Sequence, residues 1–106
     1  LVHNYMLFWA ALGLFFSIDG DMEMGCWFDY GMFLQSFMLA AREMGLETCA
    51  QAAFCPYHDT VMSLLDAPAE QMLVCGMSLG YADPEALINT YRTDRLDASE
   101  FMTILD

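Results

Sequence analysis

The chain of 106 residues contains no lysine, and its guanidinium groups are those of Arg42, Arg92 and Arg95. Against these three cations stand 15 Asp and Glu residues, so the formal net charge is −12 at pH 7. Nucleic acids and anionic membrane surfaces are bound chiefly through clusters of basic side chains. The composition therefore argues against both kinds of partner, and an anionic ligand has few cations to which it can bind.

The sequence also lacks a CxxC pair. Its four cysteines are Cys26, Cys49, Cys55 and Cys75. Because their number and spacing do not match a disulfide scaffold, we expect reduced thiols in a cytoplasmic protein. The spacing of Cys55 and His58 resembles a pair of metal ligands, so a small zinc module is one alternative function.

The common catalytic loops are absent: there is no P-loop, GxGxxG, HExxH or nucleophile elbow. The apolar run Tyr5–Ile18 is too short for a bilayer span, which needs about 20 residues, and it lacks the positive n-region of a signal peptide. His58 and Asp59 are adjacent at the start of a predicted helix, so we expect them to point in different directions. The sequence therefore offers no conventional catalytic group.

The most prominent segment that is present is the apolar stretch Trp27–Met44. It is rich in Leu, Met, Ala and Phe, which predicts a helix. Gly45 follows where a left-handed residue ends a helix, and Arg42 lies in the last turn, near the negative end of the helix dipole. Because nearly every face of this helix is apolar, we expect it to be buried, with neighbours supplied by the chain or by a partner.

The amount of apolar sequence is high for such a short chain. Hydrophobic residues make up 58% of it, compared with about 45–50% in typical domains. A chain of this length buries roughly 65% of its unfolded surface, which is too little to hide all of that apolar area. The chain also begins with Leu1 in an apolar run. We therefore expect residues 1–106 to be a partial domain that needs further sequence or a partner subunit.

The other apolar runs predict a small sheet. Ala11–Ile18 and Gln71–Tyr81 are near-continuous apolar stretches, as strands buried on both faces are. Between them we expect a short strand at Leu46–Cys49, a crossing loop at Ala50–Pro56 and a helix at His58–Leu65. Helices packed on a sheet in this order indicate an α+β or α/β layer arrangement.

The last quarter of the sequence is more polar. Ala82–Arg95 is predicted to be a loop. Asp97 and Glu100 have the spacing of a capping box, which predicts a last helical turn. An edge strand at Phe101–Leu105 is the alternative.

Two features suggest a bound ligand. Residues 49–53 have mostly small side chains and follow a predicted strand, which leaves their backbone N–H groups accessible to a planar polar molecule. Arg92 and Arg95 lie three positions apart, and a guanidinium group suits the geometry of a phosphate. A pair of solvated arginines in an exposed loop is the simpler alternative.

Four strings of the sequence also carry a resemblance to a known family. They are GMFLQSFMLAAREMGLETC at Gly31–Cys49, QAA at Gln51–Ala53, MLVCGMSLGYADP at Met72–Pro84, and RTDR at Arg92–Arg95. In this order and spacing they resemble the C-terminal half of FMN-dependent nitroreductases. Trp9 and Ala11 depart from the family pattern, which usually has Gly and Pro there, and Ala50 stands where Pro is common.

The resemblance implies an α+β fold around a mostly antiparallel sheet, with the long helix in the core of an intertwined homodimer. FMN would lie at the dimer interface, beside the backbone of Gln51, Ala52 and Ala53. Arg95, together with Arg92, would hold the FMN phosphate.

The implied reaction passes a hydride from NADH or NADPH to the flavin and then to a nitroaromatic, quinone or similar acceptor. On this reading, residues 1–106 are the C-terminal portion of a nitroreductase-like domain, and we expect this portion alone to bind FMN weakly. The alternative is a non-catalytic half-domain that dimerises through the apolar helix without tight flavin binding.

Overall fold

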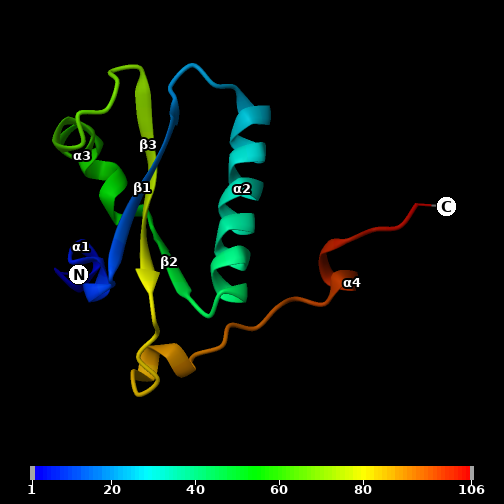
Figure 1. The fold of residues 1–106 in the computed structure, drawn as a ribbon. Coiled ribbons are helices and arrows are strands. Elements are labelled where there is room, and N and C mark those ends of the chain that lie inside the picture. Colours follow the sequence, from blue (N-terminus) through cyan, green and yellow to red (C-terminus); the bar gives the residue numbers. More distant parts are fainter. Residues whose placement is uncertain (1, 106) are drawn as a thin grey trace.

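The computed structural model describes residues 2–105, which build a three-stranded sheet between two helical layers (Figure 1). The strands are β1 (Leu12–Asp19), β2 (Glu47–Gln51) and β3 (Gln71–Gly80). Their spatial order is β1-β3-β2, and both pairs are antiparallel. The longest apolar strand is therefore central, as its sequence predicted, and the α+β class with an antiparallel sheet is confirmed.

Helices cover the two faces of the sheet (Figure 1). The long helix α2 (Met24–Glu43) runs along one face. The 3₁₀ helix η2 (Ala52–Tyr57) and the helix α3 (His58–Leu64) lie on the other. The short helix α1 (Val2–Tyr5) and the turn η1 (Leu7–Trp9) lie on the same side as α3.

Two element boundaries differ from the predicted ones, one in a strand and one in a helix. Ala50 and Gln51 were expected in a loop, but they pair with Met77 and Gly76 and so extend β2. The long helix begins at Met24, three residues earlier than predicted.

At its other end α2 stops as predicted. Gly45 has a φ of +76°, and the Leu46 N–H donates to the carbonyl oxygen of Ala41 at 2.9 Å. This is the six-residue hydrogen bond of a Schellman motif.

The core on the α3 side of the sheet is small. Phe54, Met62 and Leu73 are its buried members, and Phe15 packs against them. The rings of Phe54 and Phe15 meet edge-on with 5.0 Å between their centroids. Gly76 lies under this contact, because a Cβ atom there would be 2.6 Å from Cδ2 of Phe54. The absence of a side chain at Gly76 therefore lets η2 pack closely against β3.

On the opposite face, one stripe of α2 packs against β1. The ring of Phe16 meets those of Phe33 and Phe37, with centroid distances of 6.2 Å and 5.6 Å. The Tyr30 hydroxyl donates to the carbonyl oxygen of Ser17 at 2.8 Å. Burial is the main cause that raises the pKa of Tyr30, so this phenol stays a neutral donor at physiological pH.

The rest of α2 is not covered by residues 2–105, so this chain supplies only part of the neighbours that an apolar helix was expected to need. Ala41 is the one buried residue of α2, whereas Phe28 is 70% and Leu39 is 61% exposed. The helix was predicted to be buried because it is apolar all round, and that property persists. What the pattern could not specify is that a three-stranded sheet covers one side of a helix and leaves the other bare.

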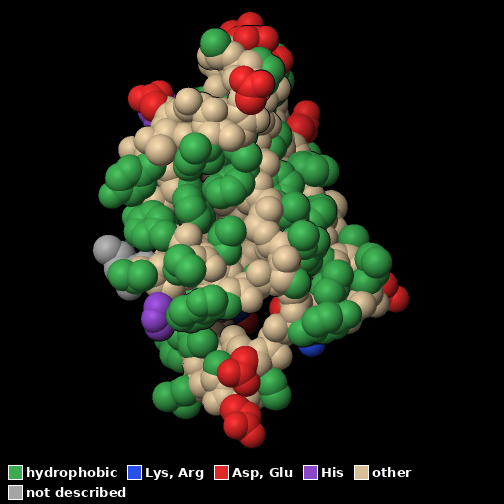
Figure 2. Space-filling view, turned by 60° about the vertical axis from the view of Figure 1, so that its left-hand side comes forward, with side chains coloured by type: hydrophobic (Ala, Val, Ile, Leu, Met, Phe, Trp, Pro, Cys, Tyr) green, Lys and Arg blue, Asp and Glu red, His purple; other side chains and the backbone are tan. Residues whose placement is uncertain are grey.

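The exposed apolar surface extends beyond α2. Figure 2, which turns the left-hand side of Figure 1 forward, shows hydrophobic side chains over much of that surface and acidic ones near its two ends. The accessible area is 8564 Å², compared with about 6,000 Å² for a compact protein of this mass. The radius of gyration is 16.6 Å, compared with about 13 Å expected for a compact chain.

Residues 81–105 leave the layers at the end of β3 (Figure 1). They contain the 3₁₀ helix η3 (Leu87–Thr90) and the short helix α4 (Ala98–Phe101). The predicted capping box is confirmed: Asp97 accepts from the Ser99 N–H, and Glu100 accepts from the Asp97 N–H. Hydrogen bonds from the Ser99 hydroxyl and the Ser99 backbone N–H to its carboxylate hold the Asp97 pKa below its usual value. The alternative of an edge strand is wrong for the described residues.

The contact between Gly76 and Phe54 generates a stability prediction. Gly76→Ala forces the Phe54 ring to move within a closely packed core, and we expect a loss of about 1–3 kcal/mol in the free energy of unfolding. Thermal and urea unfolding of the protein measure it. In a Phe54→Leu background the same alanine should cost much less, since the ring it strikes is gone. Equal costs in the two backgrounds would contradict the packing described here.

Candidate functional site

The predicted small-residue bend lies at the junction of β2 and η2. Gln51 ends β2 opposite Gly76, and Ala52 begins η2. The side chain of Ala52 is exposed and that of Ala53 is half-buried. The chain thus presents backbone and methyl groups at this point, with little side-chain bulk between them and a ligand.

Gln51 differs from its neighbours because its side chain is turned inward and is only 2% exposed. Its Nε2 donates to both oxygens of Asn4, to the backbone carbonyl at 2.6 Å and to Oδ1 at 2.7 Å. Its Oε1 accepts from the hydroxyl of Ser78 at 2.7 Å. Gln51 is therefore committed to internal contacts, and the accessible part of the bend is the exposed Ala52 with the half-buried Ala53.

Asn4 and Ser78 were not predicted as part of this site. The signal in the sequence was weak: Ser78 is a single hydroxyl within the apolar run of β3, and Asn4 is a lone amide in an aromatic segment. The Ser78 hydroxyl also lies 2.8 Å from the carbonyl oxygen of Leu7. These bonds fasten the N-terminal segment to the centre of the sheet beside the bend.

Arg92 and Arg95 lie on the C-terminal segment, and the structure does not bring them to the bend. Arg92 donates to the carbonyl oxygens of Asn89 and Tyr91, and Arg95 donates to Thr93 and to the carbonyl oxygen of Asp94. Both side chains are exposed. A role for them in phosphate binding therefore stays a prediction.

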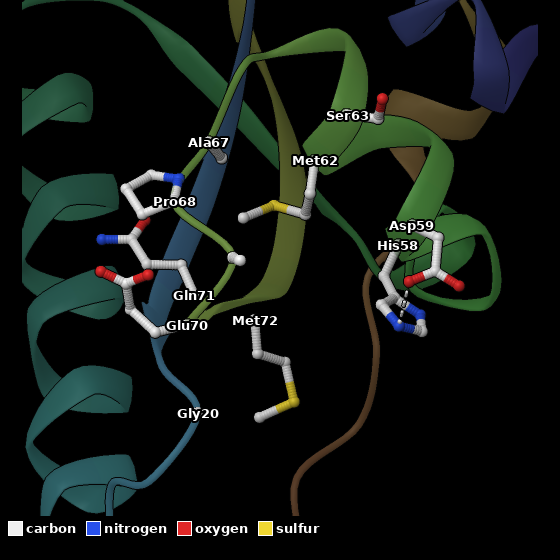
Figure 3. Close-up of a pocket in the computed structure, with 11 residues that line it drawn as sticks. Gly20, His58, Asp59, Met62, Ser63, Ala67, Pro68, Glu70, Gln71 and Met72 are labelled. Carbon is white, nitrogen blue, oxygen red and sulfur yellow. Dashed lines mark ion pairs between the residues drawn. The ribbon is translucent and has the colours of Figure 1, made fainter.

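A hollow of about 500 Å³ lies between α3, the start of β3 and the turn at Gly20 (Figure 3). His58 Nε2 is 3.0 Å from Asp59 Oδ1 at its rim, so the expectation that these two side chains point apart is wrong. Because both side chains are more than half exposed, this is a solvated pair rather than a catalytic dyad.

The structure gives no support to the zinc alternative. The Cys55 thiol donates to the carbonyl oxygen of Val74 at 3.2 Å, on the sheet side of η2. Within residues 2–105, no three His, Cys, Asp or Glu side chains are grouped as metal ligands would be. Burial raises the pKa of the Cys75 thiol, and the neighbouring Cys55 adds to this, so Cys75 is not an activated nucleophile.

Among residues 2–105, no helix combines the length and the apolar character that crossing a bilayer requires.

Most of the chain is similar to known proteins. The model of the Nitroreductase family matches residues 1–81. The chain is 44% identical over 98 residues to a 4-nitrobenzoate reductase of Pseudomonas putida, covering 92% of this chain and 43% of that protein. It is 39% identical over 102 residues to a chloronitrobenzene nitroreductase of Comamonas testosteroni, covering 96% and 45%.

Solved structures show the same similarity. An FMN and NADPH-dependent nitroreductase, NfnB from Sphigopyxis sp. strain HMH, matches with a TM-score of 0.93 and 35% identity, over 97% of this chain and 46% of that one. NfnB from Mycobacterium smegmatis, solved in complex with NADPH, matches with a TM-score of 0.92 and 29% identity, over 98% and 46%. The chain spans less than half the length of each of these relatives. From the family match and the shared fold, we conclude that this chain belongs to the nitroreductase family.

Proposed function

We propose that this chain forms the C-terminal part of an FMN-dependent oxidoreductase, which passes a hydride from NAD(P)H through the flavin to a nitroaromatic, quinone or similar acceptor. The main support is the similarity in fold, over 97% of the chain, to an enzyme described as FMN and NADPH-dependent. The reductases of 4-nitrobenzoate and chloronitrobenzene among the relatives support an aromatic nitro compound as acceptor.

The residues present fit FMN in their chemistry. The junction of β2 and η2 offers small side chains at Ala52 and Ala53 beside which a flat ring could lie. The first N–H groups of a helix have no acceptor within it, so those of η2 are suited to a ring that becomes anionic on reduction. Bound flavin would supply the hydride-transfer chemistry itself.

The phosphate of FMN needs cations, and in a chain of net charge −12 these are scarce. We propose that Arg95, assisted by Arg92, binds the phosphate through charge-assisted hydrogen bonds. The guanidinium N–H groups of both arginines now donate to exposed backbone carbonyl oxygens. A phosphate could replace these acceptors at little cost in free energy. The course of residues 81–105 depends on what packs against them, so the arginines need not stay where this chain alone leaves them.

We further propose that a second copy of the chain covers the bare apolar surface. The area in excess of a compact protein is about 2,500 Å², within the range of obligate dimer interfaces. Large apolar side chains are exposed along the whole C-terminal segment. They include Tyr81, Leu87, Ile88, Tyr91, Leu96 and Phe101. A homodimer would bury both this segment and the outer side of α2.

A cytoplasmic location is part of the proposal. Four free cysteines, two of them exposed, are typical of a reducing compartment. The second candidate function is a non-catalytic half-domain. It is favoured by the placement of Arg92 and Arg95, which form hydrogen bonds within the C-terminal segment and not at the bend. The two candidates differ in whether FMN binds.

Flavin binding through Arg95 is directly testable in the full-length protein that contains this chain. Arg95→Ala should weaken FMN binding at least tenfold, because hydrogen bonds between charged groups contribute about 1.5–3 kcal/mol. Quenching of FMN fluorescence on titration measures the dissociation constant. Arg42→Ala removes the same side chain from a surface pair with Glu47 and is the control. Equal affinities for the two variants would exclude a role for Arg95.

The dimer proposal predicts a different result at the outer side of α2. Phe28→Asp places an unpaired charge in the proposed interface, where it should cost several kcal/mol and shift the full-length protein toward monomer. Phe28→Leu keeps an apolar side chain and should leave the dimer intact. Sedimentation velocity over a range of concentrations distinguishes the species. A Phe28→Asp protein that dimerises as well as the parent would place the interface elsewhere.

A further inference from the structure

One hydroxyl on β3 has two acceptors. Ser78 Oγ lies 2.7 Å from Gln51 Oε1 and 2.8 Å from the carbonyl oxygen of Leu7. A serine hydroxyl carries a single hydrogen, and neither acceptor carries one. The Gln51 amide cannot be turned over to help, because its Nε2 is held by the two oxygens of Asn4. One hydrogen is therefore shared between the last residue of β2 and the N-terminal segment.

The hydroxyl and its Gln51 partner are both buried. Ser78 is 5% and Gln51 is 2% exposed, and Leu7 is half-buried. A buried carbonyl oxygen that loses its donor is costly to the folded state. Removing the Ser78 hydroxyl would therefore leave Gln51 Oε1 without its donor, and it would also remove the contact that ties the Leu7 carbonyl oxygen to β3.

The segment that contains Leu7 is held in an unusual conformation. Leu7, Phe8 and Trp9 have φ values of 51°, 52° and 57°, in the left-handed region that bulky residues seldom adopt. Such a conformation persists only where surrounding contacts fix it. Within the turn, Ala10 N–H donates to the Leu7 carbonyl oxygen at 3.0 Å, and that same oxygen is the one that faces Ser78.

Side chains complete the attachment of this turn. Leu7 packs over Gly13 of β1, where an added Cβ would be 2.2 Å from its Cδ1. On the outer side of the turn, Phe8 is 46% and Trp9 is 66% exposed. The turn therefore presents two aromatic side chains to the surroundings while its backbone is fastened to the sheet.

We propose that Ser78 is a positioning residue that joins the bend at residues 51–53 to the turn at residues 7–9 as one rigid unit. The inference rests on the proposed function in so far as the bend receives the flavin. Ser78 itself would touch no ligand. Through Gln51 it fixes the start of the bend, directly before the exposed Ala52, and through Leu7 it fixes the turn that carries Phe8 and Trp9.

The chain contains a matched control for this pair. The Ser17 hydroxyl on β1 donates to Gln71 Oε1 at 2.7 Å, near the other end of β3. This serine–glutamine bond is partly buried, and Gln71 is the single acceptor of the hydroxyl among the described residues. Ser17→Ala therefore removes a similar hydrogen bond without touching the bend or the turn.

The experiment compares full-length Ser78→Ala, Ser78→Thr and Ser17→Ala with the parent protein. Hydrogen exchange of the apoprotein reports on the Trp9 and Ala10 amides, and FMN titration reports on the bend. We expect Ser78→Ala to speed exchange at both amides about tenfold and to weaken FMN binding by a similar factor. Ser17→Ala should leave both within about twofold of the parent. Ser78→Thr, which keeps the hydroxyl, should restore most of each loss.

Three results would overturn the proposal. Unchanged exchange in Ser78→Ala would mean that the turn does not depend on the hydroxyl. Equal changes in Ser17→Ala would reduce Ser78 to an ordinary buried hydrogen bond. Faster exchange with unchanged FMN affinity would remove the connection to the bend. A parent protein that takes up no FMN would instead refute the proposed function, and exchange would still decide whether Ser78 holds the turn.

Discussion

The structure depends above all on a mismatch between one helix and the sheet that supports it. α2 is apolar on nearly every side, but β1, β3 and β2 together present it with one face. Packing of Phe33 and Phe37 on Phe16 satisfies one stripe, and the opposite side keeps residues such as Phe28 exposed. The fold is therefore stable only as far as something else covers α2, and the proposed homodimer would meet that need.

The other side of the sheet shows how the same small frame can position a site. Gly76 admits Phe54 and so brings η2 close to β3. η2 begins directly after Gln51, whose side chain is held by hydrogen bonds with Asn4 and Ser78. Gln51 is buried as a whole, so the exposed surface of the bend begins at Ala52. A flavin bound there would meet a rigid main chain, which is the kind of preorganised contact that stabilises a developing charge without reorganisation.

The sequence predicted the parts of this fold that local chemistry controls. Gly45 at positive φ and the Asp97–Glu100 capping box follow from residues close together in the chain, and the apolar runs of β1 and β3 follow from period and length. The bend at residues 51–53 and the family were found through motifs. The Ser78 contacts were not predicted because they join residues 27 and 71 positions apart. The sequence predicted that α2 needs neighbours on every side, but a pattern shows which faces are apolar and not which of them this chain leaves bare.

Native mass spectrometry of the full-length protein is the most direct test of the central claim that these residues belong to a flavin-binding assembly closed by a second copy. The account predicts a dimer that carries one non-covalently bound FMN per chain, in which loss of the dimer also releases the cofactor. A monomer with α2 stably exposed, or a dimer that takes up no FMN from excess, would contradict it.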